Sequence, residues 1–186
     1  ANSTHSTNAA VQHTIYIAVC MMVAPRPDLA GLTDAQGNYP KNLFGVFETL
    51  AYIDSSVALI KRFFPDAMTV GTIYNSSEPQ SRDALEELQK AATAAGMKFI
   101  AMPVTNSSET QLVTQSLIAK KPDVFFALPD NVIFASFETV VKACNEAQLP
   151  VFTSEAGLVG RGAIASYGAD FYQWGFQAGV EAANYL

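Results

Sequence analysis

The clearest indication of the fold class is the segment Asp123-Val-Phe-Phe-Ala-Leu-Pro-Asp-Asn131. Its apolar residues run from Val124 to Leu128 without the alternation of a half-exposed strand, which is typical of a parallel strand buried on both faces. Such a strand needs a layer of helices on each face of its sheet. The stretch therefore predicts an α/β protein with a parallel sheet.

Four segments repeat the order of apolar strand, polar turn and helical pattern. The strands begin near Thr69, Lys98, Asp123 and Pro150, at intervals of 29, 25 and 27 residues. Helical patterns are expected over residues 53–64, 78–95, 108–121 and 132–148, the third opening on a capping box at Ser108-Glu-Thr-Gln111. This alternation predicts right-handed crossovers with helices on both faces.

The two ends of the chain differ from this middle part. Strand-like runs occur at 14–20, 42–47 and 162–168, and residues 171–186 are helix-like. We expect residues 52–158 to form lobe two, and residues 1–51 and 159–186 to form lobe one together. About three strands are fewer than the ~5–6 of an average sheet, so we expect lobe one to be incomplete and the chain to be a fragment.

Composition excludes several classes of function. The 11 Lys+Arg and 17 Asp+Glu residues give a net charge of −6, and the positive charges are scattered, which excludes a nucleic-acid partner. No run approaches the ~20 apolar residues of a membrane span, so we expect no direct membrane insertion. The first residues lack the pattern of a signal peptide, so no export signal is expected in this chain.

Polar side chains follow every strand of lobe two. In parallel sheets ligands bind beyond the carboxyl ends of the strands, where the loops converge. The candidates there are Asn75, Ser76, Ser77, Glu78, Thr105, Asn106, Ser107, Asp130, Asn131, Ser154 and Glu155. Asp130 follows the most apolar strand and suits a ligand ammonium group. The alternative for each residue, and an equal one for Asn131, is that it only caps a helix.

A second candidate lies at the start of the chain. Ser3 and Thr4 precede a short helical pattern over residues 8–12, and hydroxyl groups at a helix start can hold a carboxylate. The alternative is an ordinary frayed terminus.

Catalytic and cofactor sites find little support. Cys20 and Cys144 could form a two-thiol racemase site, but Cys144 falls inside a helical pattern and both thiols are expected to be buried. His5 and His13 have no further ligands at metal-binding spacing. Because phosphate-binding glycine motifs are missing too, we expect no cofactor, no metal and no enzyme.

Several motifs together resemble a known family. They are Asp123–Asn131, Leu149-Pro-Val-Phe-Thr-Ser154, Arg161-Gly-Ala-Ile-Ala-Ser-Tyr-Gly168, Asp170-Phe-Tyr-Gln-Trp-Gly175 and Tyr74-Asn75 with Glu78-Pro-Gln-Ser81. In these motifs the chain is similar to the ABC-transporter substrate-binding proteins of the tryptophan type. The resemblance implies the type 1 periplasmic-binding-protein fold, with two Rossmann-like lobes; residues 21–41 depart from the usual pattern.

The resemblance also implies a function. It is that of the solute-binding component of an ABC importer, which binds an amino acid or related zwitterion in the cleft between its lobes. Its expected partner is a membrane permease, and its expected location is the periplasm or, as a lipoprotein, the cell surface. Carried over by position, the ligand residues are Asn75, Asp130, Asn131, Ser154 and Glu155, with Ser3 and Thr4 on lobe one. The alternatives are a sensory domain of a receptor or transcription regulator, and the racemase.

Overall fold

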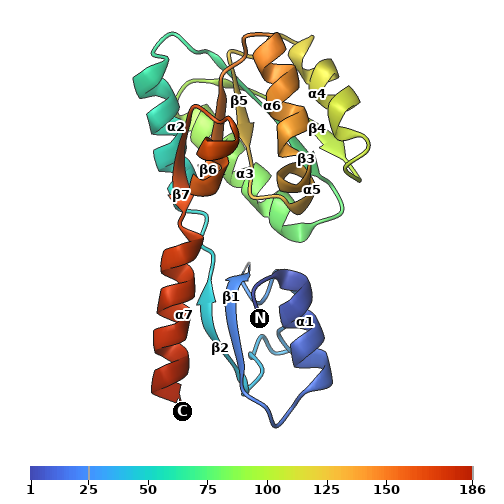
Figure 1. Cartoon of the computed structure of the whole chain (residues 1–186), viewed down its shortest axis with the longest axis vertical. Helices are drawn as coiled ribbons and strands as arrows, with labels where there is room; N and C mark the ends of the chain where they lie inside the picture. The colour runs from blue at the N-terminus through green and yellow to red at the C-terminus, as the bar shows by residue number, and fades with distance from the viewer. Residues whose placement is uncertain (25, 186) are drawn as a thin grey trace. The chain divides into compact units, whose positions relative to one another are not determined.

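A computed structural model describes residues 1–24 and 26–185, which form two compact units (Figure 1). Unit 1 combines Ala1–Thr49 with Asp170–Leu186, and unit 2 is Leu50–Ala169. The chain therefore passes between the units twice, after Thr49 and after Ala169. Among the described residues, no helix has both the length and the apolar character needed to cross a membrane.

Unit 2 contains a five-stranded parallel sheet in the order β4-β3-β5-β6-β7. Its strands are β3 (Thr69–Asn75), β4 (Lys98–Val104), β5 (Val124–Ala127), β6 (Val151–Glu155) and β7 (Ala165–Ala169). Its helices are α2 (Tyr52–Phe63), α3 (Pro79–Ala94), α4 (Thr110–Ile118), α5 (Asn131–Ala135), α6 (Phe137–Glu146) and the 3-10 helix η1 (Ala156–Arg161). The predicted α/β class is confirmed.

Strand β5 lies at the centre of this sheet and is buried on both faces. Phe126 and Leu128 pack in one cluster with apolar residues of α2 and α3. Phe125 and Ala127 pack in a second cluster with residues of α4 and α6. All four side chains are fully buried, and each phenylalanine contributes about 1.5–3 kcal/mol by leaving water. The prediction of a two-sided buried strand is confirmed.

Strand β7 corrects the expected boundary of the lobes. We expected residues 159–169 in lobe one, but β7 pairs with β6 in unit 2, with Phe152 opposite Ala165 and Thr153 opposite Ser166. The buried Ser56 hydroxyl on α2 donates to the Tyr167 carbonyl at 2.7 Å and fixes the strand to unit 2. The period of a strand does not say which sheet it joins, and this explains the error.

Unit 1 contains a two-stranded parallel sheet of β1 (Val19–Ala24) and β2 (Leu43–Phe47). Helix α1 (Thr4–His13) contacts β1, and α7 (Phe171–Tyr185) contacts both strands. The strand expected at 14–20 begins later, and residues 15–17 are exposed. The Asn42 side chain donates to the carbonyls of Thr14 and Ile17, both at 3.0 Å, and so holds these residues in a turn.

Two details of the helices also differ from expectation. The prediction of a capping box at residues 108–111 is wrong, because α4 begins at Thr110. The Glu109 carboxylate instead accepts from the Thr105 backbone N–H at 2.8 Å. These contacts lower the pKa of Glu109. The helix expected over 132–148 is divided into α5 and α6 at Ser136, whose hydroxyl donates to the Val132 carbonyl.

Gly168 in β7 tests how tightly unit 2 is packed. Its φ is +153°, and a Cβ atom there would meet the Ser154 carbonyl oxygen and, at 2.8 Å, the Tyr52 ring. We expect Gly168→Ala to lower the free energy of unfolding by about 2 kcal/mol. Gly160→Ala, where no atom lies within 4 Å, should change it by less than about 0.5 kcal/mol. Urea unfolding measures both; equal stability of the two variants would contradict this packing.

Candidate functional site

Of the thirteen residues predicted as candidates, eleven close or follow the strands of unit 2 and so lie at one edge of its sheet. Parallel strands end on the same side, so the residues that close β3, β5 and β6 share this edge. Among them are Asn75, Ser76, Asp130, Asn131, Ser154 and Glu155. The other two, Ser3 and Thr4, belong to unit 1. We call the edge with these six residues the strand-end edge.

Asp130 is the most enclosed carboxylate at this edge, with only 1% of its surface exposed. One oxygen, Oδ1, accepts from the backbone N–H groups of Val132 at 2.9 Å and Ile133 at 3.1 Å, which caps α5. The other, Oδ2, accepts from the Asn75 N–H at 2.6 Å and the Ser81 hydroxyl at 2.5 Å. Four donors from three segments of unit 2 therefore converge on one carboxylate.

This geometry corrects the role expected for Asp130. A carboxylate offers about four acceptor positions, and protein donors occupy all four here. A buried charge that is fully hydrogen-bonded is stable where it lies, but it has no acceptor left for a ligand ammonium group. Asp130 therefore joins the end of β3, the start of α5 and Ser81 in α3, and so positions the residues around it.

Glu78 brings Asn75 and Asn131 together on the outer side of Asp130. Its Oε1 accepts from the Asn75 side-chain amide at 3.0 Å. Its Oε2 accepts from the amides of Gln80 and Asn131, both at 3.1 Å. Glu78 is half-buried and Asn131 is exposed. We call the cluster of Glu78, Asn75, Gln80 and Asn131 the amide–carboxylate cluster.

The remaining residues of the edge have different surroundings. The Ser76 N–H donates to the Val104 carbonyl at 3.2 Å, which extends the β3–β4 ladder. The Ser154 hydroxyl is buried and has no hydrogen-bond partner within residues 1–24 and 26–185. Glu155 is half-buried and caps η1 by accepting from the Gly157 N–H at 2.7 Å.

Ser3 and Thr4 stand at the start of α1, which begins at Thr4 and is longer than the helical pattern expected over residues 8–12. Ser3 is the N-cap, and its hydroxyl accepts from the Ser6 N–H at 3.2 Å while the Ser6 hydroxyl accepts from the Ser3 N–H at 3.1 Å. Both residues are half-buried. The helix start is therefore ordered by its own reciprocal cap, and the frayed-terminus alternative does not hold for it.

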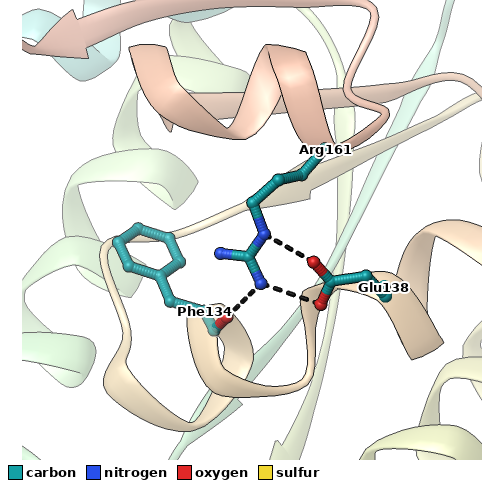
Figure 2. A network of polar contacts seen from close by, with 3 residues as sticks. All are labelled: Phe134, Glu138 and Arg161. Atoms are coloured by element: carbon teal, nitrogen blue, oxygen red, sulfur yellow. Dashed lines mark hydrogen bonds and ion pairs between the residues drawn. The ribbon is translucent and has the colours of Figure 1, made fainter.

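An arginine connects the segments that follow β5 and β6 (Figure 2). The Arg161 guanidinium donates to both oxygens of Glu138, at 2.6 and 2.8 Å, and to the Phe134 carbonyl at 2.9 Å. It also lies over the Phe137 ring, 5.5 Å from the centroid. We call this group the Arg161 clasp. It joins the end of η1 to the turn between α5 and α6.

The pKa of Glu138 sets the pH range in which the Arg161 clasp is charged. The hydrogen bonds from Arg161 lower the pKa of the Glu138 carboxyl from 4.5 to about 2. Because this pKa is depressed in the folded state, the stabilising effect of the pair is complete above about pH 4.5 and is lost as pH falls through about 2. At neutral pH the clasp is fully charged.

Cys144 was the residue behind the racemase alternative. It is fully buried in α6, and burial raises the pKa of its thiol to about 12. A thiol that stays protonated and enclosed is a poor nucleophile, so its surroundings give the racemase alternative no support.

Glu78 was predicted only as one of several strand-end candidates, whereas Ser81 and Arg161, which also organise this edge, were not predicted as site residues. Glu78 had the clearest signal, since it follows Asn75 closely and directly precedes Pro79 at the start of α3. Ser81 and Arg161 had no local signal, because their partners Asp130 and Glu138 lie 49 and 23 residues away in the chain.

Known proteins resemble this chain in sequence and in architecture. The curated tyrosine-binding protein of Clostridioides difficile is 33% identical over 184 residues, which are 99% of this chain and 53% of that protein. A crystal structure from Streptococcus pneumoniae, of an ABC domain in complex with L-Trp, is 26% identical with a TM-score of 0.86. A conserved domain protein from Vibrio cholerae is 33% identical with a TM-score of 0.85.

The extent of these matches matters for what they show. Each of the two solved structures covers 98% of this chain, and the chain covers 61% of each of them. The chain thus spans about half the length of the curated relative. The expected type 1 periplasmic-binding-protein fold is confirmed by these likenesses. Because a sequence model of the ABC transporter substrate binding protein family also matches residues 1–186, the chain belongs to that family.

Proposed function

We propose that this chain acts as the solute-binding component of an ABC importer outside the cytoplasm and binds an aromatic amino acid. Family membership supports the general role, with a membrane permease as the partner that receives the solute. The choice of an aromatic amino acid is supported by the tyrosine-binding relative and by the L-Trp complex. On this proposal the protein binds and releases its ligand unchanged.

The amide–carboxylate cluster is the observation that carries the proposal. An amino acid presents an ammonium group, and a partly exposed carboxylate surrounded by amides is suited to it. Glu78 meets this description, with Asn75 and Asn131 as neighbouring amides. We therefore assign the ammonium contact to Glu78 and leave Asp130 the role of positioning.

Three other residues of the strand-end edge complete the proposed site. The buried Ser154 hydroxyl keeps its hydrogen-bonding capacity for a group outside the chain. Ser76 directly follows β3 and Glu155 is the last residue of β6, so these two half-buried residues close the strands on either side of β5. Within unit 1, we propose the helix start at Ser3 and Thr4 as a place that favours an anion, because N–H groups at a helix start attract negative charge.

Ligand chemistry tests the proposed function directly. In isothermal titration calorimetry with the purified protein, we expect L-tyrosine or L-tryptophan to bind. The matching analogue without the amino group, such as 3-(4-hydroxyphenyl)propionate for tyrosine, should bind at least about tenfold more weakly, since it cannot pair with Glu78. Binding of neither amino acid, or equal binding of the analogue, would overturn the proposal.

Two carboxylate variants separate binding from positioning. Glu78→Gln keeps the size of the side chain but removes its charge, so it should weaken amino-acid binding about tenfold and leave the deaminated analogue unaffected. Asp130→Ala leaves four donors without their acceptor and should lower the free energy of unfolding by about 3 kcal/mol.

Calorimetry and urea unfolding measure these two effects. Glu87→Gln on the exposed side of α3 is the matched control, since Glu87 pairs only with Lys90 among the ion pairs of the described residues. It should change neither property. Unaltered amino-acid affinity in Glu78→Gln would remove Glu78 from the site, and unaltered stability in Asp130→Ala would disprove its positioning role.

A further inference from the structure

We propose that the Arg161 clasp is a positioning device that holds the Glu155 loop (residues 155–161) against the Asn131 loop (residues 130–138). The inference rests on the proposed function, because those two loops carry residues of the proposed site. Neither Arg161 nor Glu138 is assigned a ligand contact. Their effect on binding would pass through the loops that they join.

The place of the clasp in the chain supports this role. Glu155 caps the start of η1, and Arg161 is the last residue of the same short helix. Asn131 opens α5, and the Phe134 carbonyl that accepts from Arg161 lies one turn further on. The clasp therefore joins Arg161, at the end of the Glu155 loop, to Phe134 and Glu138 in the Asn131 loop.

The geometry of the contact favours orientation over stability. A guanidinium that spans both oxygens of a carboxylate fixes direction as well as distance. The same group is held on a third side by the Phe134 carbonyl and faces the Phe137 ring. Yet the two charged side chains are 38% and 66% exposed, and an ion pair so exposed adds little to global stability.

The interior supports the clasp from below. Leu158 of η1 is buried in the same cluster as Ile133 of α5 and Phe137 of α6. That apolar contact keeps η1 near the helices but does not fix its rotation, since hydrophobic contacts are not directional. The bidentate pair supplies the missing direction. Losing it should free the η1 segment while leaving the core of unit 2 packed.

Three variants test the clasp. Arg161→Met keeps the length of the side chain without its donors, and Glu138→Gln keeps the shape of the acceptor without its charge. We expect each to weaken L-tyrosine or L-tryptophan binding about fivefold, with the melting temperature within about 3 °C of the parent. The double variant should be no weaker than the single ones, because both remove the same contact. Lys90→Met, which breaks the exposed pair with Glu87, is the control and should leave affinity unchanged.

Hydrogen exchange gives a readout that needs no ligand. The Gly157 N–H donates to the Glu155 carboxylate, so its protection reports whether the start of η1 keeps its geometry. Faster exchange across residues 156–161 in Arg161→Met, with normal exchange in β5, is the expected result. Unchanged exchange there, additive losses of affinity, or a general loss of stability would overturn the inference. A parent protein that binds no aromatic amino acid would refute the proposed function, while the exchange result would still decide the clasp.

Discussion

Burial of β5 on both faces is the constraint on which the rest of unit 2 depends. A parallel strand of this kind can be stable only when helices cover each side of the sheet, and α2 with α3 and α4 with α6 provide this cover. Polar side chains near the centre of the sheet must then gather where the strand ends. Asp130 lies just beyond the end of β5, after Leu128 and Pro129, and the strand-end edge is built around it.

A carboxylate this deeply buried is tolerated only if hydrogen-bond donors surround it. The buried Asp130 and the half-buried Glu78 therefore have different roles. Asp130 accepts four hydrogen bonds and fixes the end of β3 to the start of α5. All four acceptor positions of Asp130 are therefore taken by donors of the protein itself. Glu78 is half-buried and has amide partners, and it is the residue that we propose for the ammonium contact. The most buried acid is therefore the least available one.

Much of the fold could be predicted because it follows from local patterns. The spacing of the βα units and the continuous apolar run of β5 depend on neighbouring residues, so they are visible in one sequence. The strand-end edge followed from the general rule for parallel sheets, which is why the site candidates of unit 2 could be placed on one edge. The errors concern pairing. The run at 162–168 looked like a strand but gave no sign that it joins β6, and Ser136 gave no sign that it divides a helix.

The α/β class, the order of the elements and the polar residues that close each strand could all be read from the sequence, because they depend on side-chain period and turn chemistry. The folded structure was needed to find which of those polar residues already have hydrogen-bond partners within the protein. The bonds from Asn75 and Ser81 to Asp130, and from Arg161 to Glu138, join positions 55, 49 and 23 residues apart. Hydrogen bonds act over about 3 Å in space, whatever the separation along the chain, so no local pattern announces them.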